Sequence, residues 1–425
     1  MKLKKERLSA INELIEMTKD SRAINNLFIP YIESVMDMIE KNIFRPLPSL
    51  TNMAVCVSET GVEEEEQTFD PSWLHLHGIY ELLLQLILSE HCDSKIFKPF
   101  ITPDFMSEFL QLFDSNVSEE REVLKNILHK LYAKLVPRRK MIRKAITDLF
   151  HLLIHEIHKF NGTNELLDIM ASIISGFAVP LREEHVIFFK NIIIPLYKVQ
   201  TASLYIENLM KCTSLFLMKD NSLTIPLLEG LLRYWPFANG AKELAFLAEL
   251  IEVFDYSDVD KLERLIGKLF RRIARCISGN HLQVADRAMC LFENDHMIQI
   301  IQHYKKITYG ILVPAILYIL ENHWNVMIKE GLRGLREILE RIDKDAYNAA
   351  LENLSKQKYD KTLRIAQPID ERNKMDQKWK CLAKVAIKNN PSFIEPVLPF
   401  SDCFIPSEYN LVYRMVYNKE KYINE

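Results

Sequence analysis

Glycine is scarce in this sequence, which has only 11 glycines among 425 residues. An average protein contains about 7% glycine, because turns, bulges and phosphate-binding loops depend on it. The Gly-x-Gly-x-x-Gly, P-loop and Gly-x-Ser-x-Gly motifs are all missing. The scarcity argues against Rossmann and barrel enzymes and favours helices joined by short connections.

Paired cysteines and long apolar runs are missing as well. The seven cysteines are scattered and never form a Cys-x-x-Cys pair, which indicates reduced thiols in an intracellular compartment. No run reaches the roughly 18 apolar residues of a spanning helix, and no apolar core follows the charged segment 1–7. The net charge of -3 gives no general attraction to nucleic acid or acidic membrane. We expect a soluble protein with neither a signal peptide nor a membrane span.

A complete metal-ligand set is also lacking. His151, His155 and His158 lie at i, i+4 and i+7 of one expected helix, which can place imidazoles on one face. The His-Glu-x-x-His order is absent, and no cysteine or carboxylate stands at a spacing that completes a site. Packed or solvated imidazoles are the simpler interpretation. We therefore expect no metal, no cofactor and no enzymatic activity.

Helical periodicity is what the sequence does contain. Apolar residues recur at helical spacing, and no alternation typical of strands occurs. Outside the stretch 122–185, helices are expected over 2–19, 24–41, 70–88, 102–115, 201–219, 221–235, 241–254, 258–278, 281–302, 304–322 and 325–341. Paired neighbours give units of about 40 residues, the period of HEAT and armadillo repeats. The predicted fold is all-α, a HEAT-like helical-repeat solenoid in which antiparallel helix pairs form a curved superhelix.

Changes in composition divide the chain into parts. We expect an N-terminal helical extension over 1–24, the solenoid over 25–385, and a C-terminal tail over 386–425 that the pattern does not place. The segment 45–70 contains prolines and the acidic run 63–66, whose mutual repulsion predicts a solvated loop. A specific acidic docking site is the alternative interpretation of this loop.

The stretch Glu122–His185 is expected to form four helices, which are separated by Pro137, by Asn161-Gly162, and by Gly176 with Pro180. Residues three or four apart share a helix face, and three such pairs are His129 with Tyr132, Ile169 with Ile173, and Arg182 with His185. The last pair lies at the start of the fourth helix, where backbone N–H groups favour an anion. Stacked helices can thus line a groove with an apolar floor and a cationic end. The spacing is equally compatible with ordinary core and surface pairs.

A basic cluster lies inside the same stretch and consists of Lys134, Arg138, Arg139, Lys140, Arg143 and Lys144. Such a cluster can bind nucleic-acid phosphates or act as a nuclear address. Only Tyr132 is close enough to add base stacking. A solvated cationic face and a protein-binding face are the alternatives, and nucleic acid is the least favoured.

Several segments resemble the B-prime regulatory subunits of protein phosphatase 2A over about residues 25–385. These segments are Asp70–Leu76, Leu128–Lys134, Ile142–Lys144, Phe160–Gly162, Glu165–Leu167, Ser172–Leu181, Leu231–Pro236, Gln283–Ala288 and His323–Asn325. The resemblance implies a horseshoe of HEAT-like repeats that joins a scaffold subunit and a catalytic subunit. It also implies a groove that holds peptides of the form Leu-x-x-Ile-x-Glu.

The first half of the expected groove lies near Pro137. By resemblance, His129 and Lys130 correspond to a His-Arg pair that meets acidic or phosphorylated peptide positions. Tyr132 and Arg139 correspond to groove-lining residues. Lys130 departs from the family's arginine, so it keeps the charge but loses the bidentate fork.

The second half lies on the third and fourth helices of the stretch. Ile169 and Ile173 correspond to the apolar floor, and Arg182 with His185 corresponds to the group that receives the peptide glutamate. Arg182 replaces the family's lysine. The segment 114–120 also departs, since it carries Asn116 and Val117 in place of acidic residues, and this puts any role of that loop near the phosphatase in doubt.

The leading functional hypothesis is a non-catalytic regulatory subunit of protein phosphatase 2A that recruits substrates through short linear motifs. Its expected partners are the scaffold and catalytic subunits and motif-bearing substrate proteins, with no nucleic acid. The expected location is the cytoplasm, with the nucleus as a second. Another HEAT-repeat adaptor, such as a transport factor, is the alternative, and a nucleic-acid-binding solenoid is the third.

Overall fold

The computed structural model of the chain describes residues 2–18, 20, 22, 24–47, 73–156, 159–236, 239–279, 281–365, 385 and 388. The chain divides into two units, Met1–Leu351 and Glu352–Glu425. Most of the predicted acidic loop 45–70 and of the predicted tail 386–425 lies outside the described residues, as does His158.

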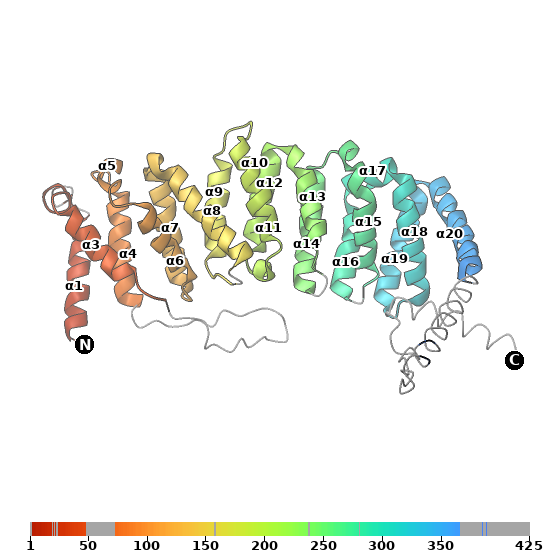
Figure 1. The fold of residues 1–425 in the computed structure, drawn as a ribbon, viewed down its shortest axis with the longest axis horizontal. Coiled ribbons are helices and arrows are strands. Elements are labelled where there is room, and N and C mark those ends of the chain that lie inside the picture. Colours follow the sequence, from red (N-terminus) through yellow and green to blue (C-terminus); the bar gives the residue numbers. More distant parts are fainter. Residues whose placement is uncertain are drawn as a thin grey trace. The chain divides into compact units, whose positions relative to one another are not determined.

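All regular elements in the described part of the chain are helical, as predicted (Figure 1). The α-helices are α1 (Lys2–Met17), α3 (Ile32–Ile43), α4 (Trp73–Leu88), α5 (Ser94–Phe97), α6 (Pro103–Gln111), α7 (Ser118–Lys134), α8 (Arg139–His155), α9 (Thr163–Ser175), α10 (Glu183–Phe188), α11 (Ile194–Leu196), α12 (Ile206–Lys219), α13 (Thr224–Arg233), α14 (Gly240–Asp255), α15 (Glu263–Ile277), α16 (Leu282–Cys290), α17 (Asp295–His303), α18 (Lys305–Asn322), α19 (Val326–Ile342) and α20 (Lys344–Ile365). Short 3₁₀ turns cover Leu112–Asp114, Val136–Arg138, Gln200–Leu204, Asn221–Leu223, Val259–Leu262 and Leu291–Glu293, and π-helical segments cover Ile24–Phe28 and Phe189–Ile193.

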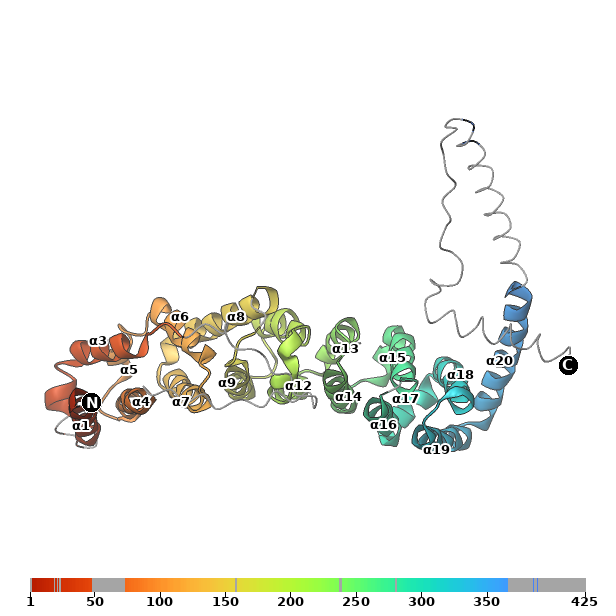
Figure 2. The same cartoon turned by 90° about the horizontal axis from the view of Figure 1, so that it is seen from below.

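The helices of the first unit stand in two layers (Figure 2). In one layer, each helix contacts the next in the order α1, α4, α7, α9, α12, α14, α16 and α19. In the other layer the order is α6, α8, α11, α13, α15 and α18. Contacts such as α13 with α14 and α18 with α19 join the layers into helix pairs. This arrangement is the two-layered helical repeat that the periodicity predicts.

Hydrogen bonds between successive repeats show the spacing of the repeat. Asn208 Nδ2 donates to Asn164 Oδ1 across 44 residues, and Cys212 Sγ donates to the Leu167 carbonyl across 45 residues. Both bonds join α12 to α9. They agree with the unit of about 40 residues expected from the sequence.

Two expected helices are broken in the structure. The stretch 281–302, predicted as one helix, forms α16 and α17, because Asn294 accepts a hydrogen bond from the His296 N–H and begins a new helix. The stretch 24–41 breaks into a π-helical segment and α3 around Pro30, which has no N–H to continue a helix. Apolar periodicity continues across both breaks and hides them.

The turn between α8 and α9 is tied to the segment that precedes α7. The Asn161 side-chain amide donates to the Asp114 carbonyl and to Asn116 Oδ1, both at 3.0 Å. A Cβ at Gly162 would lie 2.4 Å from Phe113 Cβ, so this close approach requires glycine. The departure at Asn116 therefore serves a contact within the fold.

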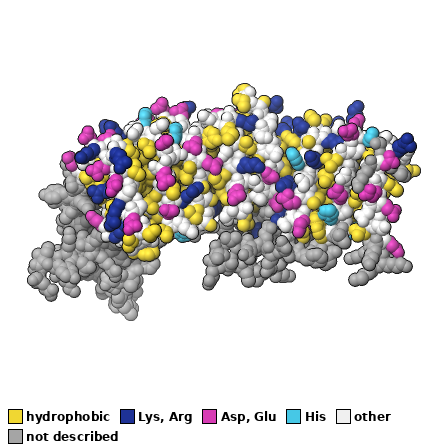
Figure 3. Space-filling model, turned by 180° about the vertical axis from the view of Figure 1, so that it is seen from behind, with side chains coloured by type: hydrophobic (Ala, Val, Ile, Leu, Met, Phe, Trp, Pro, Cys, Tyr) yellow, Lys and Arg dark blue, Asp and Glu magenta, His cyan; other side chains and the backbone are white. Residues whose placement is uncertain are grey.

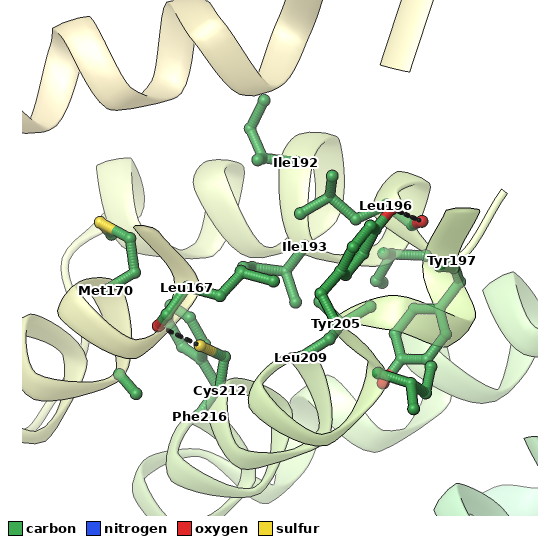
Figure 4. Close-up of a cluster of buried hydrophobic side chains, with 14 of the residues drawn as sticks. Leu167, Met170, Ile192, Ile193, Leu196, Tyr197, Tyr205, Leu209, Cys212 and Phe216 are labelled. Carbon is green, nitrogen blue, oxygen red and sulfur yellow. Dashed lines mark hydrogen bonds between the residues drawn. The ribbon is translucent and has the colours of Figure 1, made fainter. Parts of the chain in front are cut away.

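A core of buried apolar side chains runs through the first unit. Figure 4 shows one part of it, where Leu167 of α9 meets Ile193, Leu209 and Phe216 from the following elements. The Tyr205 hydroxyl donates to the Leu196 carbonyl at 3.2 Å within this cluster. This packing joins α9, the π-helical segment Phe189–Ile193 and α12, the elements on either side of α10 in the chain.

Candidate functional site

Tyr132 and two arginines form the first half of the site, at the junction of α7 and α8. Arg139 donates from Nε to the Tyr132 carbonyl at 2.9 Å, and its guanidinium lies 5.2 Å from the centre of the Tyr132 ring. Arg143, one turn further along α8, donates to the Tyr132 hydroxyl at 3.0 Å. Tyr132 and Arg139, both expected to line a groove, thus lie in contact, and Arg143 contacts Tyr132 as well.

Three residues at the start of α10 form the second half. Glu184 Oε1 lies 3.9 Å from an Arg182 nitrogen and 3.5 Å from His185 Nε2. The same oxygen lies 4.0 Å from Arg143 of α8. One carboxylate oxygen thus connects the two halves of the site, and Tyr132, Arg143, Arg182 and His185 form a continuous network around it.

His185 is buried beside this network and stacks on an aromatic ring. Its ring stacks on Phe177, with ring centres 3.7 Å apart and planes 3° apart, and Phe177 in turn packs near Phe216 of α12. His185 Nδ1 is buried and has no hydrogen-bond partner among the described residues. Burial, together with the positive charges of Arg143 and Arg182, lowers the pKa of His185, although the charge of Glu184 opposes this. A lowered pKa keeps the imidazole neutral near pH 7.

The other predicted site residues take two contrasting positions. Ile169 and Ile173 are only 2% and 5% exposed and belong to the core between α7, α9 and α12. A ligand meets only the small exposed edges of these side chains in this conformation. His129 and Lys130 are exposed on α7, and helical spacing puts His129 on the same face as Tyr132.

A ladder of charges borders this face of α7. Asp168 of α9 lies between Lys125 of α7, at 3.4 Å, and Lys211 of α12, at 2.9 Å. Although burial of Asp168 acts the other way, these two lysines lower its pKa. The ladder keeps α7, α9 and α12 in register beside the site.

The basic cluster expected from the sequence is largely used inside the fold. Lys134 donates to backbone carbonyls at Ile87 and Ser89, and Arg138 donates to the Lys98 carbonyl. Since Arg139 and Arg143 both contact Tyr132, four of the six cations already have partners in the fold. Acidic and basic side chains are also interspersed on the face seen in Figure 3. A nucleic-acid interface needs a continuous cationic surface, and this cluster does not supply one.

Most of the chain, including the candidate site, matches the model of one protein family. A family model described as protein phosphatase 2A regulatory B subunit (B56 family) matches residues 1–386. The chain belongs to this family. The match covers the whole described site and extends through α1, which packs on α4.

Curated B56 relatives are similar over most of the chain. The B' gamma isoform of the 59 kDa regulatory subunit of protein phosphatase 2A from Arabidopsis thaliana is 37% identical over 351 residues, which are 83% of this chain and 66% of the relative. The regulatory subunit pptr-1 of Caenorhabditis elegans is 38% identical over 329 residues, or 77% of this chain and 59% of the relative. The chain thus spans about two thirds or less of the length of these relatives.

The sequence pattern does not predict two residues of the candidate site. The sequence pattern assigns Arg143 only to the basic cluster, and it does not single out Glu184. Tyr132 and Arg143 are eleven positions apart on different helices, so no helical spacing relates them. The available sequence signal is the concentration of Arg182, Glu183, Glu184 and His185 directly after the turn at Pro180.

The described residues offer no site for metal chemistry. No group of three or more His, Cys, Asp or Glu side chains among them could hold a metal ion. His151 and His155 stack on each other on α8, with ring centres 6.3 Å apart. No helix within the described ranges is long and apolar enough to cross a membrane.

Proposed function

We propose that this B56-family chain is a non-catalytic regulatory subunit that binds the phosphatase 2A scaffold and catalytic subunits and recruits substrates through Leu-x-x-Ile-x-Glu-like motifs. Family membership supports the first part. The second part rests on the site at α7 to α10, where Tyr132, Arg143, Arg182 and His185 converge.

The observation that carries the motif-binding proposal is the position of Glu184 Oε1. It lies within 4.0 Å of Arg143, Arg182 and His185, so the geometry of the site already accommodates a carboxylate. A peptide glutamate presented from outside meets the same three groups. Charge-assisted hydrogen bonds to such groups contribute about 1.5 to 3 kcal/mol each.

Apolar peptide positions fit the neighbouring surface. The half-buried Tyr132 ring and the edges of Ile169 and Ile173 offer an apolar strip on α7 and α9. The exposed His129 and Lys130 lie nearer the middle of α7, where they meet acidic or phosphorylated residues between the anchors. This part of the binding is expected to weaken with added salt, because exposed charges are screened.

A binding experiment tests the motif site. Arg182→Ala should weaken a Leu-x-x-Ile-x-Glu peptide by about tenfold or more, since it removes a charge-assisted contact. Replacing the peptide glutamate by alanine should cost as much, and the two changes together should cost little extra. Fluorescence anisotropy or calorimetry measures all four combinations.

Lys190→Ala is the matched control, because Lys190 is exposed just beyond α10 and also carries one positive charge. It should change the affinity far less than Arg182→Ala. Equal affinity of wild type and a folded Arg182→Ala variant would remove the pocket assignment. Affinity purification from the native cell tests the role as a regulatory subunit separately, and absence of a phosphatase catalytic subunit would contradict it.

A further inference from the structure

Glu184 is an acidic side chain inside a group of cations that is proposed to bind an acid. Its carboxylate makes three long contacts, at 3.5, 3.9 and 4.0 Å, with groups from α8 and from the start of α10. None of the three has the length of a strong charge-assisted hydrogen bond, about 2.7 to 2.9 Å. The side chain is also 48% exposed, so water has ready access to it.

The cations around Glu184 therefore keep unused binding capacity. Arg182 is 78% exposed on its side chain, and it can turn toward a ligand without breaking any shorter ion pair. Arg143 is held in place from the other side by the Tyr132 hydroxyl. The guanidinium groups of Arg143 and Arg182 carry two positive charges, and Glu184 offsets one of them.

His185 adds a second, independent observation. The residue is 9% exposed, yet Nδ1 has no hydrogen-bond partner among the described residues. An unsatisfied buried polar atom costs about 1 to 3 kcal/mol, and such atoms are rare in folded proteins. The ring lies flat against Phe177, and tilting it toward another partner would break this stack.

We propose that Glu184 is an internal competitor, which occupies the cationic group of the free protein and must be displaced before a ligand carboxylate binds. The identity of that ligand rests on the proposed function above. Glu184 then sets the specificity of the site, because it lowers the affinity for every anion and makes the apolar anchors of a peptide necessary. An acidic peptide without those anchors cannot displace it.

Glu184→Gln tests this proposal with a Leu-x-x-Ile-x-Glu peptide. The substitution keeps the shape of the side chain and removes its charge, so the peptide should bind about two- to tenfold more tightly, the range expected when weak exposed ion pairs stop competing. A peptide with glutamine in place of the glutamate should gain little from the same substitution. A role of Glu184 in positioning Arg143 predicts the opposite, a loss of affinity.

Glu183→Gln is the matched control, since Glu183 is exposed, precedes Glu184 directly and makes no ion pair among the described residues. It changes the net charge by the same amount, and it should alter peptide binding much less. The gain of Glu184→Gln over Glu183→Gln isolates the local competition from the general field of the protein.

A second ligand separates this proposal from the motif proposal. Titration with inorganic phosphate, followed through the His185 ring by nuclear magnetic resonance, needs no peptide. Tighter phosphate binding in Glu184→Gln than in Glu183→Gln supports the role of Glu184 as an internal competitor, whether or not the wild-type chain binds a motif peptide. Failure of the wild-type chain to bind the peptide would overturn only the motif proposal. If Glu184→Gln increases the affinity for neither phosphate nor peptide, the proposal that Glu184 is an internal competitor is wrong.

Discussion

Two acidic residues, one near each end of α7, have opposite environments. At its first turn, Glu120 is fully buried and accepts four hydrogen bonds of 2.5 to 3.0 Å, two from Arg45 and one each from Tyr80 and Ser115. Near its last turn, Glu184 of α10 is half exposed, and it meets Arg143 and Arg182 only at 4.0 and 3.9 Å and the neutral His185 at 3.5 Å. The same ion types thus occur in a closed arrangement and in an open one.

The difference lies in how completely the contacts of each carboxylate are satisfied within the fold. Around Glu120 both carboxylate oxygens have short contacts, and the neighbouring Arg121 pairs with Glu165 of α9 at 2.9 Å. These contacts join α4, α7 and α9, three successive helices of one layer. Around Glu184 the contacts are long, the cations are accessible, and His185 keeps an unsatisfied nitrogen. The number and length of the contacts therefore distinguish the two carboxylates.

The largest effect is expected at the closed end. Glu120→Ala should lower the free energy of unfolding by about 3 to 5 kcal/mol, because it removes the buried carboxylate that accepts hydrogen bonds from Arg45, Tyr80 and Ser115. Urea unfolding of the full chain, followed by circular dichroism, measures this. Glu119→Ala is the control, since Glu119 lies in the same first turn, and it should cost at most about 1 kcal/mol through the helix dipole. Equal effects of the two variants would contradict the distinction between closed and open sites.

A third acid sharpens the comparison, since it is buried without a cation. Glu249 of α14 is 1% exposed and accepts a hydrogen bond from Thr213 at 2.7 Å, and no Lys or Arg pairs with it in the described part of the chain. Burial raises the pKa of Glu249 to about 7. The fold therefore favours the protonated acid.

The pH dependence at Glu249 follows from that shift. Because its pKa in the folded chain is above the unfolded value of 4.5, its contribution to stability is fully present below pH 4.5 and is lost as the pH rises through about 7. Glu249→Gln, which stays neutral, should raise the free energy of unfolding at pH 8 by about 1 to 3 kcal/mol and should have little effect at pH 5. Glu252→Gln, at an exposed acid on the same helix whose charge is a lesser cause of the raised Glu249 pKa, should show a much smaller dependence. Urea unfolding at the two pH values measures these free energies. A pH-independent effect of Glu249→Gln would contradict the raised pKa of Glu249.

The fold is largely predictable from the sequence, and the site only in part. Helices and the repeat of about 40 residues follow from local periodicity, which is why α18 and α19 lie within about a residue of their expected bounds. Apolar periodicity does not reveal the break at Asn294, because this helix start depends on a single hydrogen bond from the backbone to one side chain. Spacing places Arg182 beside His185, but Arg143 and Glu184 lie on different helices, and only the packing of α8 against the segment after α10 brings them together.

The smallest effects are expected at the open end, where binding and stability should separate. Arg182→Ala and Glu184→Gln should each change the free energy of unfolding by less than about 0.5 kcal/mol, because exposed ion pairs near 4 Å contribute little. The same substitutions should change anion affinity in opposite directions, a loss for Arg182→Ala and a gain for Glu184→Gln. Urea unfolding and peptide binding on the same protein samples measure both properties. A loss of stability at either position comparable to that of Glu120→Ala would place these charges among the structural contacts and remove the contrast between the two ends of α7.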